Sequence, residues 1–427
     1  MAQSWNETQL PRLIREIVGR EMGGGKTPPG DETDLVENGL LDSMGWVGVL
    51  TGIEALTGIA NFGSSWPEDR PQSIRALVDT AAEGIKAGDV QAKEERQEQA
   101  AAHGGGPIVL TGWGYAVGSM EMRAAEIEKE CGLPPGTLHS AAGFESMRYA
   151  TEREDQVSLA QKAAEAALDA AGIEVGDVDL MVATSATFPA LPSFAAALHT
   201  RLLLPESCAA MDTGGACVAL PAALKVASSI LRAEGHGTAL AVASEVHSRV
   251  LASLRAPGQF RGLFGDGACA FVLRAERTRE EQKLTVGRFT FGCAGGLASA
   301  LRAELTANAN FEFQFKGEQL GRAAVDRLVR VIEQLERLSG RSRSEAAAFA
   351  IHEPNPRLVG IFAQNARVPL DKIALVSRRF GNLGSATCGV GLCAALDRLA
   401  QAPDAGRPLI FLAAVGPGLL WAGTYLH

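Results

Sequence analysis

Apolar residues in the first part of the chain recur every three or four positions. This spacing is typical of amphipathic helices and predicts three of them, over residues 6–20, 43–57 and 71–82. A loop rich in Gly and Pro follows the first helix, and the segment before the second helix is acidic. We therefore expect a small all-helical bundle over residues 1–83.

Residues 84–106 break this pattern. The stretch 91–102 is charged and rich in Ala, and His103-Gly-Gly-Gly106 closes the segment. Because it has no apolar face to bury, we expect the segment to be a linker. It would span up to about 75 Å if it were fully extended.

From Pro107 onward, short apolar runs alternate with helical segments rich in Ala. The expected strands cover residues 107–114, 179–185, 207–214, 237–245, 268–275, 284–293, 347–352, 373–377, 409–415 and 419–426. The expected helices cover residues 156–171, 220–234, 318–338, 357–366 and 388–400. The order recurs after a charged loop, which predicts an α/β fold of two similar halves, 107–280 and 281–427.

The composition is that of a globular protein, with 46% hydrophobic and 21% charged residues among 427. No uninterrupted apolar run of about 20 residues occurs, so we expect no membrane span. The first residues lack the basic-then-apolar pattern of a secretion signal. The seven cysteines are scattered, without a Cys-x-x-Cys pair or a His/Cys cluster, which argues against zinc and favours a reducing cytoplasm.

Negative charge is concentrated in the helical part of the chain. Residues 1–85 hold 6 Lys and Arg and 13 Asp and Glu. This part therefore carries −7 of the chain's net charge of −9. An acidic unit of this kind argues against nucleic acid as a partner. A protein partner with a basic surface fits better.

One cysteine follows a glycine turn between an expected buried strand and an expected helix. In Asp212-Thr-Gly-Gly-Ala-Cys217 the two glycines allow a sharp turn, and an apolar, Ala-rich helix follows. Because a helix N-terminus lowers the pKa of a thiol, Cys217 is a candidate nucleophile. The alternative is a small residue packed beneath the helix.

Two further polar residues occupy equivalent places in the second half. Asn382 follows a glycine before the helix at 388–400, and His352 ends an expected strand. Strand ends and helix starts at one side of a sheet are where ligands bind in α/β folds. If the halves are related by a pseudo-twofold axis, Cys217, His352 and Asn382 meet in one cavity.

The acidic run that ends in Asp42-Ser43-Met44 resembles the acyl and peptidyl carrier proteins, whose signature is Asp-Ser-Leu or Asp-Ser-Met. In that family the Ser carries a 4′-phosphopantetheine arm. The resemblance therefore implies that Ser43 is the attachment site and that a phosphopantetheinyl transferase is a partner. The alternative is a pair of ordinary helix caps, because Asp and Ser are common there.

The larger part of the chain resembles the thiolase-fold ketosynthases, most closely the ketoacyl-carrier-protein synthase III group. The motifs that carry this resemblance are Asp212-Thr-Gly-Gly-Ala-Cys217, Phe264-Gly-Asp-Gly-Ala268, His352-Glu-Pro-Asn355, Gly381-Asn382 and Gly416-Pro-Gly418. The resemblance implies two duplicated βαβαβαββ halves in α-β-α-β-α layers, and a homodimer.

It also implies roles for the three polar residues. Cys217 would attack an acyl thioester, with its own backbone N–H among the donors that hold the oxyanion. His352 and Asn382 would donate hydrogen bonds to the thioester carbonyl of a carrier-bound, malonyl-type unit. Loss of CO2 would then give an enolate that attacks the acyl-Cys, with no metal involved.

Two departures from the family pattern change these expectations. Pro417 has no N–H, so Gly418 becomes the candidate for the second oxyanion donor. Synthases primed by acyl-CoA carry a Trp before their Gly-Ile-x-x-Arg turn, and residues 132–142 contain none. We therefore expect an acyl group delivered by a carrier, in cis or in trans.

Two rival functions stay open at this point. One is plain acyl transfer to an O, N or S nucleophile without decarboxylation. The other is a non-catalytic subunit that docks a carrier protein to a sister synthase. The presence of Cys217, His352 and Asn382 together favours condensation.

Overall fold

The structure is a computed structural model of the chain. It describes residues 10–22, 28–57, 62, 66, 71–86, 106–188, 191–235, 237–276, 284–305, 311–401 and 408–427. The chain divides into two compact units, Met1–Gly104 and Gly105–His427. Most of the expected linker, 84–106, lies outside the described residues.

The described residues of the first unit form three helices: α1 (Leu10–Glu21), α2 (Ser43–Thr57) and α3 (Ile74–Lys86). Their apolar faces meet in one core, in which Ile14, Ile53 and Leu77 have no exposed surface. The side chain of Asp42 caps α2 by accepting a hydrogen bond from the Gly45 N–H at 2.7 Å. The three helices that were predicted for this part of the chain are thus present.

The acidic loop between α1 and α2 is held by a single carboxylate. Asp34 accepts hydrogen bonds from the backbone N–H groups of Val36, Glu37 and Gln72. Burial raises the pKa of Asp34, but these bonds outweigh it and the pKa lies below its usual value. The loop is therefore tied to the segment that leads into α3.

The described part of the second unit contains one long mixed sheet and two small two-stranded sheets, β2 with β3 and β9 with β10. Its strands are β1 (Ile108–Val117), β2 (Met120–Arg123), β3 (Ser146–Tyr149), β4 (Leu180–Thr184), β5 (Ala209–Asp212), β6 (Thr238–Val246), β7 (Asp266–Ala275), β8 (Leu284–Cys293), β9 (Leu301–Leu305), β10 (Phe311–Phe315), β11 (Ala346–Ile351), β12 (Leu409–Gly416) and β13 (Leu420–Leu426). The long sheet has the order β11-β12-β13-β8-β1-β7-β6-β4-β5. Its two halves join only where β1 meets β8, through two residue pairs.

Helices cover both halves of this sheet. They are α5 (Ala124–Cys131), α6 (Gln156–Ala171), α7 (Phe194–Leu202), α8 (Ala219–Glu234), α9 (His247–Ser253), α10 (Gly258–Arg261), α11 (Gly317–Ser339), α12 (Pro356–Ala366), α13 (Ser377–Phe380) and α14 (Thr387–Ala400).

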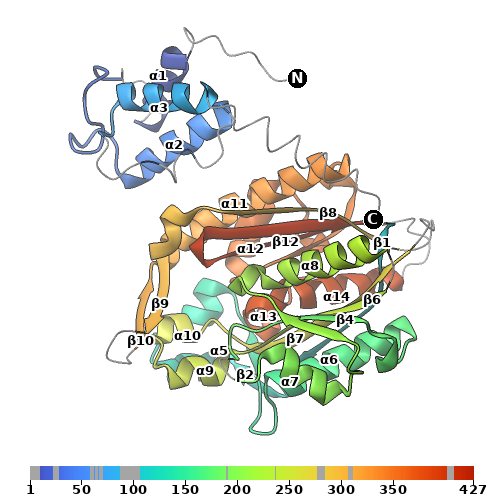
Figure 1. Cartoon of the computed structure of the whole chain (residues 1–427). Coiled ribbons are helices and arrows are strands. Elements are labelled where there is room, and N and C mark those ends of the chain that lie inside the picture. The colour runs from blue at the N-terminus through green and yellow to red at the C-terminus, as the bar shows by residue number, and fades with distance from the viewer. Residues whose placement is uncertain are drawn as a thin grey trace. The chain divides into compact units, whose positions relative to one another are not determined.

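The main helices and the sheet form five layers (Figure 1). Helices α6 and α7 pack on the outer face of the first half-sheet, and α11 and α12 pack on that of the second. Between the two half-sheets lie α8 and α14, whose side chains share one core with strands of both. This arrangement places the starts of α8 and α14 in the interior of the unit.

The expected strand at 373–377 is not formed, so this prediction was wrong. A 3-10 turn, η6 (Leu370–Lys372), precedes it, and only an isolated bridge joins Phe349 to Ile373. The backbone N–H groups of Val376 and Ser377 donate to the buried carboxylate of Glu353. They are therefore not available to a strand ladder, and the chain turns into α13.

The segment Ala216–Glu234, which contains α8, is long and apolar enough by length and composition to cross a membrane. A core helix passes the same test, and Leu220, Ala223 and Ala227 of α8 are fully buried in the central layer. This segment is therefore weak evidence for a membrane span.

Candidate functional site

Cys217 lies where the expected strand and glycine turn meet the central helix α8. The backbone of Gly215 and Ala216 takes positive φ values of 125° and 49°, and a 3-10 turn, η3 (Ala216–Val218), leads into α8. The end of β12 comes close to this turn. A Cβ on Gly416 would lie 3.3 Å from the Cβ and 3.4 Å from the backbone N of Cys217.

The thiol of Cys217 rests in its protonated form. Burial raises its pKa, the carboxylate of Glu245 raises it further, and the pKa reaches about 12 although the backbone N–H of Cys217 opposes the shift. The lowered pKa expected from the helix N-terminus is therefore wrong for the resting site, because desolvation of the thiolate outweighs it.

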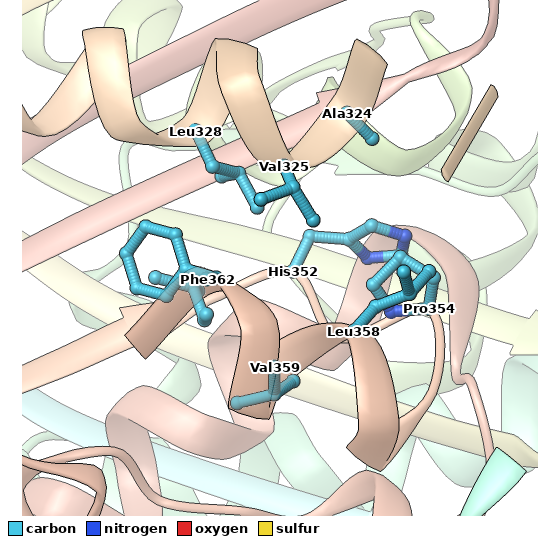
Figure 2. Close-up of a pocket in the computed structure, with 9 residues that line it drawn as sticks. Ala324, Val325, Leu328, His352, Pro354, Leu358, Val359 and Phe362 are labelled. Atoms are coloured by element: carbon cyan, nitrogen blue, oxygen red, sulfur yellow. The ribbon is translucent and has the colours of Figure 1, made fainter. Parts of the chain in front are cut away.

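His352 follows β11 and is only 3% exposed. Its backbone N–H donates to the carbonyl of Ala413 at 2.8 Å, which continues the pairing of β11 with β12. Figure 2 shows the imidazole between α11 and α12, at a small apolar cavity that Val325 and Leu358 help to line. Among the residues that the structure describes, the buried Nδ1 of His352 has no hydrogen-bond partner.

The imidazole of His352 is neutral near pH 7. Burial lowers its pKa to about 4, and the neighbouring His247 adds to this shift. A hydrogen bond with the backbone of Gly384 acts in the opposite direction but is the weaker effect. A neutral imidazole keeps one N–H donor and one acceptor nitrogen.

Asn382 is held by its backbone against the segment before β7. Its N–H donates to the carbonyl of Leu263, and its carbonyl accepts from the N–H of Gly265, both at 3.0 Å. The side-chain Oδ1 accepts hydrogen bonds from the Gly384 N–H at 2.9 Å and from Thr387 Oγ1 at 3.2 Å. Since a backbone N–H identifies Oδ1 as the oxygen, the Nδ2 group is left to donate elsewhere.

A short 3-10 turn, η7 (Gly384–Ala386), connects these residues. Gly384 is hydrogen-bonded to both His352 and Asn382. The next residue, Ser385, donates to Glu245 at 2.6 Å, and Glu245 acts electrostatically on Cys217. The structure therefore gathers Cys217, His352 and Asn382 around one turn.

Sequence reasoning missed Glu245, a fully buried carboxylate. It accepts hydrogen bonds from the N–H groups of Ala186 and Thr187 and from the hydroxyls of Thr187 and Ser385. These bonds tie the end of β6 to the loop after β4 and to η7. The sequence feature that could have identified Glu245 is an acidic residue at the end of a strand that is otherwise mostly apolar.

Sequence reasoning also missed His247, the first residue of α9. Its ring stacks on Phe264 with the centroids 4.4 Å apart. On another side it faces Gly384, where an added Cβ would overlap Cε1 and lie 2.9 Å from Nε2. His247 belongs to the same group of side chains as His352.

The structure does not assign roles to the two remaining candidates. Gly418 lies in the turn η8 (Pro417–Leu419), whereas the position of a Cβ on Gly416 lies 3.4 Å from the backbone N of Cys217. Ser43 opens helix α2, and its side chain lies outside the described residues. The roles of Gly418 and Ser43 stay predictions. Within the described ranges, no group of three His, Cys, Asp or Glu residues is arranged to hold a metal ion.

The part of the chain that contains this site is similar to known 3-oxoacyl-[acyl-carrier-protein] synthases. The family model of 3-oxoacyl-[acyl-carrier-protein] synthase III matches residues 211–295, and the model of its C-terminal part matches residues 337–427. A 3-oxopimeloyl-[acyl-carrier-protein] synthase from Brucella abortus is 33% identical over 327 residues, which cover 73% of this chain and 95% of the relative.

Two further proteins agree with these matches. A beta-ketoacyl-[acyl-carrier-protein] synthase III from Thioalkalivibrio sulfidiphilus is 28% identical over 74% of this chain and 98% of its own length. The crystal structure of a 3-oxoacyl-(acyl carrier protein) synthase III from Pseudomonas aeruginosa superimposes with a TM-score of 0.67 at 25% identity. That match covers 75% of this chain and 98% of the other.

Proposed function

Because the chain belongs to the 3-oxoacyl-[acyl-carrier-protein] synthase III family and is an acyltransferase of that type, we propose that it joins acyl units by decarboxylative condensation. The acyl-enzyme would form on Cys217. The observation that carries this proposal is the grouping of Cys217, His352 and Asn382 around η7.

In the first half-reaction, the sulfur of Cys217 attacks an acyl thioester and the departing thiol leaves with the proton of Cys217. The thiol pKa of about 12 means that this proton moves during the attack and not before it. The oxyanion would be held by the backbone N–H of Cys217, with Gly418 as the second candidate donor.

In the second half-reaction, a carrier-bound malonyl-type or β-ketoacyl unit enters. For a malonyl-type unit, Nδ2 of Asn382 would donate to its thioester carbonyl, and His352 would join it by exchanging its bond with the backbone of Gly384 for one to the substrate. These bonds stabilise the enolate that forms as CO2 leaves. The enolate carbon then attacks the acyl-Cys, a carbon–carbon bond forms and Cys217 leaves as a thiolate, which takes up a proton from water. The hydrogen bonds to Oδ1 of Asn382 support this role, because they fix which end of the amide can donate.

We propose that the first unit is an acyl carrier domain with a 4′-phosphopantetheine arm on Ser43. Ser43 opens α2, and Asp42 directly before it is exposed, so a modifying transferase could reach this helix start. When bound, the arm would supply the thiol that carries the acyl group. The acidic charge of the unit supports a basic docking surface, on its own synthase unit or on a second copy.

The location and the assembly of the enzyme follow from the same proposal. We propose a cytoplasmic enzyme, in line with the unpaired cysteines of the described residues. We also propose a homodimer, whose oligomeric state can be measured by sedimentation.

Intact-protein mass spectrometry of the full chain tests the proposed function. Incubation with acyl thioesters should add one acyl group to the wild type and none to Cys217→Ala. Cys388→Ala is the matched control, since Cys388 is a buried cysteine that interacts electrostatically with Cys217. This variant should still be acylated.

The second half-reaction needs its own measurement. Addition of malonyl-carrier to the acyl-enzyme should release one CO2 for each acyl group lost from Cys217. Loss of the acyl group to an alcohol, amine or thiol without CO2 would instead support plain acyl transfer. If the wild type forms no adduct with any acyl donor, both condensation and plain acyl transfer are contradicted. The function that then stays is the non-catalytic subunit that docks a carrier protein.

A further inference from the structure

His247 has a fixed ring with one open nitrogen in the group of side chains around η7. It follows β6 by one residue, two positions after Glu245, and both side chains face Gly384. His352 reaches the same glycine from the second half of the unit and interacts electrostatically with His247. The structure thus brings a second imidazole to the site already described.

Two contacts fix this ring. It stacks on Phe264, and its Nδ1 lies 3.4 Å from the carbonyl oxygen of Gly265. A carbonyl can only accept, so Nδ1 carries a hydrogen, and in the neutral ring Nε2 keeps its lone pair. The hydrogen bond recorded for this ring within the described residues is the one that Nδ1 makes.

The surroundings of His247 are otherwise apolar or occupied. Phe260 packs edge-on against Phe264, with centroids 4.9 Å apart. Glu245 is engaged by the hydroxyls and N–H groups of its neighbours, and Asp266 accepts hydrogen bonds from Ala150 and Ser248. Nε2 of His247 is therefore an acceptor that these neighbours leave open, beside the unpartnered Nδ1 of His352.

We propose that His247 is a specificity-determining residue whose Nε2 accepts a hydrogen bond from a hydroxyl or amino group on the acyl chain that enters the site. This inference rests on the proposed acylation of Cys217. An acceptor at a buried position favours a chain that brings a donor, because a plain alkyl chain leaves the nitrogen unpaired. The substrate class is thus a hydroxyacyl or aminoacyl thioester.

The test compares acylation rates of the full chain with matched donors. Pantetheine thioesters of one chain length are used in plain, 2-hydroxy, 3-hydroxy and 3-amino forms, and the second-order rate of adduct formation on Cys217 is measured by mass spectrometry. We expect the wild type to prefer at least one polar donor over the plain donor by about three- to tenfold, the effect of one hydrogen bond.

Three variants separate the hydrogen bond from packing. His247→Leu retains a side chain to pack on Phe264 but has no acceptor, and His247→Asn places its polar atoms near Nδ1 only. Both should lose the preference. His247→Gln, which places an oxygen near Nε2, should retain part of it. A packing role alone would change the rates with plain and polar donors by the same factor.

The outcomes are distinct from those of the proposed function. Adducts that form equally fast with all donors in the wild type would overturn the role of His247 and leave acylation intact. An unchanged preference in His247→Leu or His247→Asn would also overturn it. If one variant does not fold, the ratio of the rates with polar and plain donors in the other variants decides between a hydrogen bond and packing. No adduct with any donor would overturn the proposed function, and this inference with it.

Discussion

At the scale of single residues, burial decides the protonation states of the site. It raises the pKa of Cys217 to about 12 and lowers that of His352 to about 4, so both groups are neutral near pH 7. The common cause is the cost of a charge in an environment that excludes water. In the proposed mechanism, charge would develop only during the reaction, where the donors around η7 would stabilise it.

The first prediction concerns the protonation of His352. With a folded-state pKa of about 4, its imidazole should stay neutral from pH 8 down to about pH 5, so 15N NMR of His352 should show no titration in that range. The unfolded chain takes up this proton near pH 6.5. The free energy of unfolding should therefore fall as the pH decreases from about 6.5 to about 4, by at most about 3 kcal/mol from this residue.

Urea unfolding of the wild type and His352→Gln at pH 7 and pH 4.5 checks the stability part of this prediction. The wild type should lose more stability between the two pH values than the variant does. An equal loss in both proteins would mean that His352 is not the group that titrates.

The second prediction separates donation by Asn382 from its structural bonds. Asn382→Ala removes Nδ2 and should reduce kcat/KM for condensation by about 100-fold, the effect of losing one oxyanion donor. Thr387→Val removes only one of the two bonds to Oδ1 and should cost less than tenfold, since the Gly384 N–H still holds the amide. Acylation of Cys217 should be nearly unchanged in both variants. A similar loss in the two variants would contradict the role of Nδ2.

At the scale of elements, the site depends on where helices and strands end. Glu245 and His247 flank the last residue of β6, His352 directly follows β11, and η7 leads into the central helix α14. Each of these ends comes from a different part of the sequence. Gly384 lies between them with a φ of +58° and no room for a side chain, because His247 and Glu245 occupy the space beside its Cα.

The third prediction is that Gly384→Ala destabilises the fold more than the same change at a free helix end. The added Cβ would overlap His247, and the positive φ adds strain, so the free energy of unfolding should fall by about 2–4 kcal/mol. Gly172→Ala is the matched control, because Gly172 has a similar φ of +64° and nothing near its Cβ position. It should cost only about 1 kcal/mol. Urea unfolding of both variants measures the difference.

At the scale of the whole molecule, the chain consists of two units with separate cores. The helices of the first unit pack on one another, and the five layers of the second contain all three candidate catalytic residues. The second unit should therefore fold and react without the first. This separation allows the carrier proposal to be tested apart from the chemistry at Cys217.

The fourth prediction is that residues 105–427 alone retain the first half-reaction. This fragment should show a cooperative thermal transition and should be acylated at Cys217 at a rate within about threefold of the full chain, as its core is complete. Circular dichroism and intact-protein mass spectrometry measure the two properties. A fragment that folds but is not acylated would show that the first unit supplies part of the site.

The fifth prediction is that the full chain accepts one phosphopantetheine arm. Incubation with a phosphopantetheinyl transferase and coenzyme A should increase its mass by one arm in the wild type and in Ser73→Ala. Ser73 is the matched control, because it caps the neighbouring helix α3. Ser43→Ala should stay unmodified. Modification of Ser43→Ala would move the attachment site elsewhere.

Local patterns in the sequence were enough to predict most elements of the fold. The helix predicted over residues 156–171 is α6 without a change at either end, and the α/β alternation after Pro107 is confirmed. Both follow from spacing within a few turns of chain. The missing strand at 373–377 could not be predicted in this way, because its N–H groups are taken by Glu353, about 20 residues earlier in the sequence.

The sequence by itself determined which side chains can do chemistry: a cysteine after a glycine turn, a histidine at a strand end and an asparagine before a helix. Only the tertiary structure decided that Glu245 and His247 join them, that the thiol rests protonated, and that η7 connects the two halves. The physical reason is range. Turn and helix signals act between neighbours in the chain, whereas burial and the contacts around Gly384 exist only after strands more than 100 residues apart have packed.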